Sequence, residues 1–351
     1  MRELNEAEKQ LLIAVGWLRS RYGSMAGMYA DSEASRENLE AFGRRWMGKR
    51  LADWTDAYRS LTDGALLAES GGAYSLTEKG NAARKALEVT NPLWLYEYDN
   101  FFGDAAASKA HALFCERVYG KNLCQHGLAD IPQLHLLLEV LRLNAGDRAL
   151  DAGCGSGLIT EYLHDLTGAS FVGVDISEEA ITQARARTAA KGERLAFGVG
   201  NMNRLDFEPH TFSAVVAVDT LYYVNDLEET LRQLIAILKP GGQMGLFFTE
   251  WASGDEDRAS LLPENTSLAV LLKKYGLGFS TYELTGQEAE HWRKKVEALE
   301  RLKPEFEKEG NLGLYNYRYS EAIRYANWDL GKRSRHLYHV RLPGRAAADE
   351  I

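Results

Sequence analysis

The feature that most constrains this fold is a glycine-rich turn that directly follows a short apolar run. Residues 151–157 read DAGCGSG, and an apolar helical pattern begins at Ile159. Glycine tolerates positive φ and lets a ligand come close to the backbone, and the free N–H groups at the start of a helix attract anionic groups. A strand, a glycine turn and a helix in this order therefore predict a ligand site at the carboxyl end of the strand.

The chain after this turn alternates between apolar runs and helical patterns. The apolar runs lie at 172–174, 197–199, 214–218, 244–248, 279–284 and 337–342. Helical patterns lie at 159–166, 178–191 and 227–238, and a longer helix-like insertion spans about residues 285–333. Strands that are apolar without alternation are typical of a parallel sheet buried on both faces. This order of elements predicts a doubly wound α/β sheet.

Polar residues at the strand ends indicate the kind of ligand. The GxGxG spacing differs from the GxGxxG of dinucleotide sites and favours a ligand with a carboxylate over one with a pyrophosphate. Asp175 ends the second strand, where a carboxylate can accept both ribose hydroxyls of a nucleotide. Alternatively, Asp175 caps the helix that begins near Ser177. Asp151 lies before the turn and can accept from a ligand ammonium or from amides of the turn.

Two further strand ends carry candidate contacts. Met202 can place its thioether against an adenine ring and Asn201 can meet the exocyclic amine of that ring, with simple core packing of the methionine as the alternative. The fourth strand ends at Asp219, and Tyr222 and Tyr223 follow it. These two tyrosines are candidates for a direct role at the reacting centre or for packing against a neighbouring helix.

The charge and the cysteine content exclude several classes of protein. The net charge of −9 argues against binding nucleic acid through phosphate neutralisation. The three cysteines form no CxxC pair, so neither a disulfide framework nor a metal site is predicted. No apolar run approaches the roughly 20 residues that cross a bilayer, and the first residues lack a signal-peptide pattern. These features predict a cytoplasmic protein without a membrane segment.

The region before the turn divides into two predicted parts. Residues 1–90 contain helical patterns, then a hairpin and another helix, in the order of a winged-helix domain. Residues 91–146 are aromatic and helical and are predicted to cover the site, whereas residues 147–351 form the α/β domain. A basic cluster in the first part is surrounded by acidic residues and is interpreted as a solvated helix face. It comprises Arg44, Arg45, Lys49 and Arg50.

Together these motifs resemble the class I S-adenosylmethionine-dependent methyltransferases, most closely over residues 131–248. The segments that match motifs of the family are 151–157, 172–177, 200–205, 218–226 and 238–242. The resemblance implies a seven-stranded Rossmann-like sheet whose last strand is antiparallel, with the insertion at 285–333 as a helical lid. It also implies that residues 119–130 close over the cofactor, as in small-molecule methyltransferases.

The resemblance implies S-adenosylmethionine as the cofactor and assigns candidate roles to individual residues. The candidate cofactor contacts are Tyr119, Gln133, Asp151, Gly153, Cys154, Gly155, Gly157, Asp175, Ile176, Asn201, Met202 and Asp219. Asn201 stands where the family usually has Asp, and an amide oxygen can accept the same bond. The candidate catalytic residues are Tyr222, Tyr223 and His126. The candidate substrate contacts in the lid are Trp292, Tyr315, Tyr317 and Arg318.

Three functions are compatible with these patterns. The leading hypothesis is methyl transfer to a small molecule by in-line displacement at the sulfonium methyl, which the acidic charge and the long lid insertion favour. The first alternative cyclises or cleaves the cofactor itself and releases methylthioadenosine, as azetidine-2-carboxylate synthases do. The second is a cofactor-sensing regulator that binds DNA. Winged-helix-like domains also dimerise in O-methyltransferases, so a homodimer through residues 1–90 is the expectation.

Overall fold

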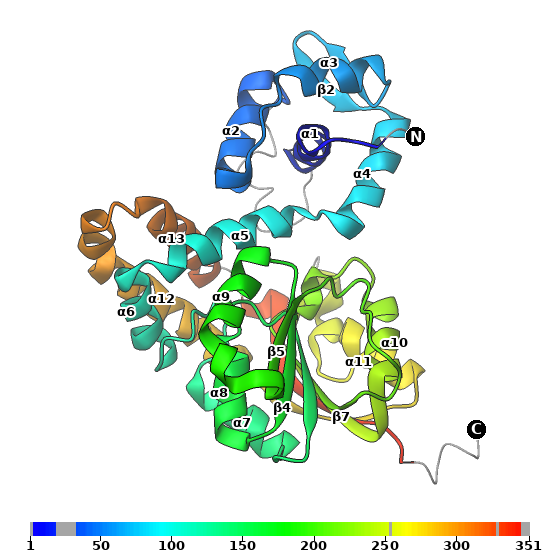
Figure 1. The fold of residues 1–351 in the computed structure, drawn as a ribbon, viewed down its shortest axis with the longest axis vertical. Coiled ribbons are helices and arrows are strands. Elements are labelled where there is room, and N and C mark those ends of the chain that lie inside the picture. Colours follow the sequence, from blue (N-terminus) through cyan, green and yellow to red (C-terminus); the bar gives the residue numbers. More distant parts are fainter. Residues whose placement is uncertain (1–2, 19–32, 253–254, 328–329, 345–351) are drawn as a thin grey trace. The chain divides into compact units, whose positions relative to one another are not determined.

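The structure is a computed structural model that describes residues 3–18, 33–252, 255–327 and 330–344 (Figure 1). Contacts within the chain divide it into two compact units, Met1–Phe101 and Phe102–Ile351. The predicted regions 1–90, 285–333 and 147–351 each include some residues outside the described ranges. Within those ranges, no helix is both long and apolar enough to cross a membrane.

The first unit consists of helices around a short hairpin. Its elements are α1 (Glu6–Leu18), α2 (Arg36–Trp46), α3 (Thr55–Asp63), β1 (Leu67–Ser70), β2 (Ala73–Leu76) and α4 (Glu78–Thr90). β1 and β2 pair antiparallel and form the predicted hairpin. Thr77 caps α4 because its hydroxyl accepts from the Gly80 N–H at 3.0 Å. The hairpin and the cap are thus present, whereas the likeness to a winged helix stays a prediction.

The basic cluster of the first unit is engaged with acidic side chains of the same unit. Arg44 lies 3.9 Å from Glu40, and Arg50 forms an ion pair with Asp99. The guanidinium of Arg45 stacks on the Trp46 ring, with 5.3 Å to the centroid. Arg44 stays largely exposed in its pair, which is consistent with the interpretation of the cluster as a solvated helix face.

Three helices precede the sheet. They are α5 (Leu93–Ala106), α6 (Lys109–Tyr119) and α7 (Ile131–Leu141). Asp130 caps α7, because its carboxylate accepts from the Gln133 N–H at 3.0 Å. The last of the three helices ends at Leu141, since Arg142 adopts a left-handed conformation with φ of +50°.

The second unit is built on a seven-stranded sheet. Its strands are β3 (Arg148–Ala152), β4 (Ser170–Asp175), β5 (Leu195–Val199), β6 (Phe212–Val218), β7 (Leu238–Trp251), β8 (Gly278–Glu283) and β9 (Arg333–Arg341). The strand order is β5-β4-β3-β6-β7-β9-β8. β3 to β7 pair parallel, and β9 runs antiparallel between β7 and β8. The predicted doubly wound sheet with an antiparallel last strand is confirmed.

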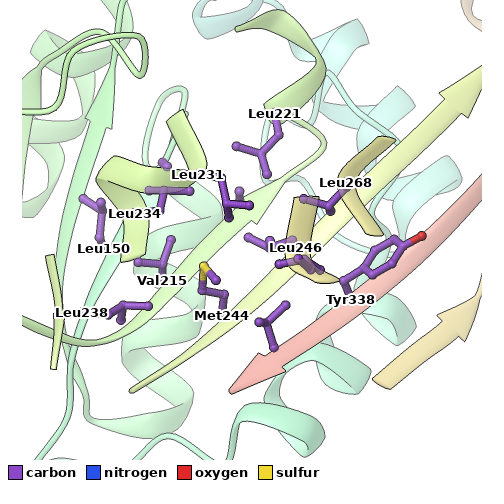
Figure 2. Packing of buried hydrophobic residues seen from close by; sticks show 14 of the residues in the cluster. Leu150, Val215, Leu221, Leu231, Leu234, Leu238, Met244, Leu246, Leu268 and Tyr338 are labelled. Carbon is purple, nitrogen blue, oxygen red and sulfur yellow. The ribbon is translucent and has the colours of Figure 1, made fainter. Parts of the chain in front are cut away.

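Helices cover both faces of this sheet. They are α8 (Leu158–Thr167), α9 (Glu178–Thr188), α10 (Leu227–Ile237) and α11 (Ser267–Lys274). α10 and α11 pack on one face, where Leu231, Leu268 and Met244 belong to one buried cluster (Figure 2). α7, α8 and α9 pack on the other face, where Leu137, Leu163 and Ile181 share a second cluster. The parallel strands are therefore buried on both sides, which their unbroken apolar runs predicted.

Two boundaries differ from the sequence prediction. The helix predicted over 178–191 ends at Thr188 and continues as a 3-10 segment, Ala189–Arg194, in which Gly192 has φ of +59°. Residues 238–242, which match a motif of the family, form an irregular start of β7: Leu238 pairs with Phe212, but the next pair joins Gln243 to Ala214. Three residues of β7 bulge out there, and Gly241, with φ of +75°, takes the bend.

The predicted lid consists of two helices between β8 and β9. α12 spans Thr285–Lys308 and α13 spans Leu312–Ala326, and the two pack against each other. α12 also packs on α6, so the lid adjoins the helix that leads into residues 119–130 (Figure 1). We call α12 and α13 the lid throughout.

Candidate active site

The glycine turn, residues 151–157, follows β3 in a conformation that only glycine adopts easily. Gly153, Gly155 and Gly157 have φ of +82°, +54° and +70°. A Cβ at Gly153 would lie 2.5 Å from Thr220, and one at Gly155 would lie 2.7 Å from Phe102. The turn is anchored to β4, because the N–H groups of Gly153 and Cys154 both donate to the Val174 carbonyl. The three glycines thus have a conformational requirement and close neighbours.

Asp175 lies beside the glycine turn. One carboxylate oxygen accepts from the Gly155 N–H at 2.8 Å, and the other accepts from the Ser177 N–H at 2.9 Å. Ser177 in turn caps α9. Asp175 therefore fixes the turn relative to the next helix, and it stands where the resemblance places the ribose contact. Ile176 follows it and is half-buried.

Asp151 lies under the turn and is buried. Its Oδ2 accepts from the Thr160 hydroxyl at 2.6 Å, whereas its Oδ1 is buried with no partner in the described part of the chain. Burial raises the pKa of this carboxyl group to about 7, against the lowering effect of the Thr160 hydrogen bond. An orphaned carboxylate oxygen at this position calls for a proton donor from a ligand.

Cys154 contributes to the turn through its backbone. Its side chain belongs to the buried cluster under α7, α8 and α9, and the Sγ atom would lie 2.8 Å from a Cβ at Gly173. Burial raises the pKa of the thiol well above its ordinary value. The predicted contact of Cys154 with the cofactor would therefore be made by its backbone atoms.

Asn201 and Met202 lie directly beyond β5. The Asn201 Oδ1 accepts from the N–H and the Nδ2 of Asn203, both at 2.9 Å, which closes a small turn. Met202 is half-buried and packs against the core under α10 and α11. The structure thus brings both residues to the same sheet edge as Asp175, while their contacts to an adenine ring stay predictions.

Asp219 directly follows β6 and has a strained conformation, with φ of +57°. Its carboxylate forms a bidentate ion pair with Arg335 of β9, with both N–O distances at 2.9 Å. It also accepts from the backbone N–H groups of Leu128 and Ala129. The carboxylate is therefore engaged within the protein, and it ties residues 127–129 to the end of the sheet.

Gln133 belongs to the same buried network. Its Oε1 accepts from Arg335 at 2.8 Å, and its amide donates to Gln287 at the start of α12. These bonds do not test the predicted contact of Gln133 with the cofactor. They show that its side chain links Arg335 to the start of α12. Sequence reasoning did not single out Arg335, because nothing in a β-strand pattern distinguishes a buried arginine with a distant partner.

The side chain of Tyr119 stabilises the segment of residues 119–130 through hydrogen bonds. Its hydroxyl donates to the Gly127 carbonyl at 2.9 Å and accepts from Arg318 at 3.0 Å. Arg318 also donates to the carbonyls of Gln125 and His126. Because Arg318 lies on α13, these bonds attach the lid to the segment that the resemblance places over the cofactor.

His126 and Tyr317 form a direct pair across this junction. The His126 Nε2 lies 2.7 Å from the Tyr317 hydroxyl. Burial lowers the pKa of His126 well below its ordinary value, and nearby Arg318 and Lys295 lower it further. The imidazole is therefore neutral at physiological pH, which is the form that can take a proton.

Tyr222 and Tyr223 lie in a 3-10 turn, Leu221–Tyr223, just after β6. Their ring centroids are 4.7 Å apart, and Tyr222 also packs edge-on against Trp251. Burial raises the pKa of the Tyr222 hydroxyl well above its ordinary value. Tyr222 can therefore exchange hydrogen bonds with a ligand, but it is not a phenolate base.

The remaining lid candidates pack within the lid. The Trp292 ring stacks on Tyr325 with 4.7 Å between centroids, and its Nε1 donates to Glu288. Tyr315 packs between Phe306 and Tyr319. The structure thus joins Tyr317 and Arg318 to His126, whereas Tyr315 contributes to the contact between α12 and α13.

The lid also buries polar residues that sequence reasoning missed. Glu288, His291 and Lys295 lie on the buried face of α12, together with Trp292 and Leu299. Their spacing of three to four residues places them on the apolar stripe of the helix. Polar residues at core positions of a helical pattern were the available signal for this cluster.

Residues 149–242 match a family model described as "Methyltransferase domain". The chain is 32% identical to a ubiquinone biosynthesis O-methyltransferase of Xanthomonas euvesicatoria over 196 residues, which cover 48% of this chain and 81% of that protein. It is 29% identical to methyltransferase GfsG of Streptomyces halstedii over 31% of this chain and 40% of that one.

Several other curated relatives are matched over only part of their length. The chain spans 32% to 55% of the first sterol 24-C-methyltransferases to which it is similar. Among solved structures, phosphoethanolamine N-methyltransferase 2 of Haemonchus contortus, in complex with S-adenosyl-L-methionine, has a TM-score of 0.58 at 16% identity. That match covers 82% of this chain and 74% of the other. At this identity the likeness concerns the fold.

Proposed function

The chain belongs to the class I S-adenosylmethionine-dependent methyltransferases, and on this premise we propose that it transfers the cofactor's methyl group to a small molecule held under the lid. The single observation that carries the proposal is the glycine turn, whose three positive-φ glycines stand between β3 and α8 beside Asp175. The lid, attached through Arg318 to residues 125–126, forms the other side of the proposed site.

The residues at the turn fit the cofactor. The methionine ammonium would donate to the orphaned Oδ1 of Asp151, and this bond would favour the charged form of the carboxyl group. The Asp175 carboxylate stands at the sheet edge where it would receive the ribose hydroxyls. Met202 and Asn201 stand at the next strand end, where the adenine ring would lie.

The chemistry that S-adenosylmethionine supplies when bound is an electrophilic methyl carbon on a sulfonium. The protein then has to place a nucleophile in line with that carbon and to keep water out. Tyr222, in the 3-10 turn after β6, can orient an acceptor through its hydroxyl. The lid and residues 119–130 would enclose the acceptor, because their buried hydrogen bonds hold them together.

A hydroxyl acceptor would also need a base. His126 is the candidate, because it is neutral and its hydrogen bond to Tyr317 orients the ring, although its lowered pKa makes it a weaker base than an exposed histidine. An amine or thiolate acceptor would need no base from the protein. The Xanthomonas relative is named for O-methyl transfer, which supports the inclusion of hydroxyl acceptors in any test.

The proposal is tested by a product assay with the purified full chain. The chain is incubated with S-adenosylmethionine alone, and then with a panel of phenols, amines, thiols and organic acids. We expect S-adenosylhomocysteine only when an acceptor is present, and none from a Gly155→Val variant. Methylthioadenosine formed without an acceptor would instead identify a cofactor-cleaving enzyme and would contradict the proposal.

A further inference from the structure

Four cations are buried at the lid and the adjoining strand β9. Three of them have a carboxylate within 4 Å: Arg335 pairs with Asp219 at 2.9 Å, Arg333 with Glu288 at 3.0 Å, and Arg318 with Glu321 at 3.6 Å. The fourth, Lys295 on α12, is 1% exposed and has no carboxylate within 4 Å in the described ranges. Lys295 is therefore the one of these four cations without a paired carboxylate in the described ranges.

The Lys295 ammonium group has hydrogen-bond donors that a ligand could use. It donates one hydrogen bond, to the Gly127 carbonyl at 3.1 Å, although an ammonium has three donors. It lies 4.0 Å from the centroid of the Trp292 ring and 5.6 Å from that of Tyr119. Aromatic faces attract a cation, but less than its lost hydration costs. An anion would complete the arrangement.

A second unpartnered polar atom lies one helical turn earlier. His291 is 3% exposed, and its Nε2 has no hydrogen-bond partner in the described part of the chain. Its ring packs against Tyr119 at 4.8 Å, so His291 and Lys295 face the same tyrosine. When Nε2 carries the proton, it can donate to the anion that Lys295 attracts.

A chain of contacts leads from Lys295 to the glycine turn. Gly127, which accepts from Lys295, lies against Asp219, since a Cβ on this glycine would be 2.9 Å from the Asp219 side chain. Asp219 is followed by Thr220, whose side chain lies against Gly153 of the turn. Lys295 thus stands behind the strand end at which the proposed methyl transfer takes place.

We propose that Lys295, assisted by His291, binds the carboxylate of a ligand in this site, so that the methyl acceptor is an organic monoacid. This inference rests on the proposed function. Because one of the four cations has no paired carboxylate in the described ranges, a singly charged carboxylate matches it and a phosphate dianion does not. The cofactor also carries a carboxylate, and the experiment below separates these two sources.

The titration of Lys295 gives the proposal a specific readout. Burial lowers the pKa of this ammonium to about 7, with a further lowering by Arg318 and an opposing effect of Glu321 and Asp219. A bound carboxylate stabilises the charged form, so binding at about pH 7.5 takes up a proton. The other groups that face Lys295 are His111 and Cys115 on α6, His126, Tyr119, and His291 on its own helix.

The experiment is calorimetry on the full chain saturated with S-adenosylhomocysteine. Benzoate is the probe, benzamide is its neutral counterpart, and each titration is run in two buffers that differ in ionisation enthalpy. We expect benzoate to bind with proton uptake, benzamide to bind much more weakly, and Lys295→Met to weaken benzoate about 30-fold or more and to remove the uptake. Lys294→Met, at an exposed position on the same helix, is the matched control and should behave as the native chain.

A second arm identifies the source of the carboxylate. The native chain and Lys295→Met are titrated with S-adenosylhomocysteine and with methylthioadenosine, which lacks the carboxylate. A loss confined to S-adenosylhomocysteine would assign Lys295 to the cofactor's carboxylate and would overturn the conclusion that the acceptor is an organic monoacid. The inference would be wrong if Lys295→Met changed neither the affinity for S-adenosylhomocysteine nor the binding of benzoate. It would also be wrong if the native chain bound no benzoate and the variant bound S-adenosylhomocysteine normally. Failure of the native chain to bind S-adenosylhomocysteine would instead contradict the proposed function.

Discussion

The glycine turn and the lid lie on two sides of the proposed site and are built by different physical means. The turn is made by the backbone: positive φ at Gly153, Gly155 and Gly157 sets its path, and two bonds to the Val174 carbonyl fix it. The lid side is made by buried side chains that meet from distant parts of the chain. A turn of the first kind suits a constant ligand such as a cofactor, whereas a lid of the second kind can change with the substrate.

The largest effect is expected on the lid side, from Arg335→Met. This change leaves the Asp219 carboxylate buried without its cation, so the free energy of unfolding should fall by about 3–5 kcal/mol. Urea denaturation measures this loss. Arg341→Met, at the exposed end of the same strand, is the control and should change the free energy of unfolding by less than about 0.5 kcal/mol. Equal stability of both variants would show that the ion pair does not hold β9 and residues 127–129 together.

The contrast also explains what could be predicted from the sequence. The strands in chain order, the glycine turn and the position of Asp175 at the end of β4 were predictable, because their patterns are local, whereas the antiparallel last strand followed from the family resemblance. The partners of Asp219 were not, because Arg335 lies 116 residues away and no short-range pattern joins the two. Lys295 was missed for a related reason: the helical pattern identified its element, but the compensation of its charge depends on three arginines and their carboxylates.

On the turn side, Gly155→Val should abolish cofactor binding. Valine disfavours φ of +54°, and its Cβ would lie 2.7 Å from Phe102. We expect the affinity for S-adenosylhomocysteine in calorimetry to fall by at least about 100-fold. Gly286→Ala is the control, because a Cβ there meets nothing within 4 Å. If the Gly155→Val variant bound S-adenosylhomocysteine normally, the cofactor would not bind at the turn. The proposed difference between the turn and the lid would then be wrong.

A smaller effect on the turn side concerns pH. Burial raises the pKa of Asp151 to about 7, so its contribution to folding stability is complete below about pH 4 and is lost as the pH rises to about 7. The ligand ammonium favours the ionised carboxylate, so the affinity for S-adenosylhomocysteine should rise about tenfold between about pH 6 and 8.

Asp151→Asn isolates this carboxyl group from the histidines and the lysine of the lid. The affinity of the variant for S-adenosylhomocysteine should not rise with pH. Its free energy of unfolding should increase relative to that of the native chain as the pH rises from about 5 to 7. Calorimetry and urea denaturation at several pH values measure the two effects. A pH dependence that survives in Asp151→Asn would place the titrating group on the lid side instead.

The smallest effect sharpens the comparison from the lid side. Tyr317→Phe removes the hydrogen bond to His126, so the free energy of unfolding should fall by about 1 kcal/mol. Tyr319→Phe, on the same helix, loses only an exposed bond to Glu300 and should cost less. Neither change should alter the affinity for S-adenosylhomocysteine in calorimetry, because neither Tyr317 nor Tyr319 is assigned a contact with the cofactor. A selective loss of this affinity in Tyr317→Phe would mean that the junction of the lid with residues 125–126 also shapes the cofactor site, and the two sides would then have to be treated as one.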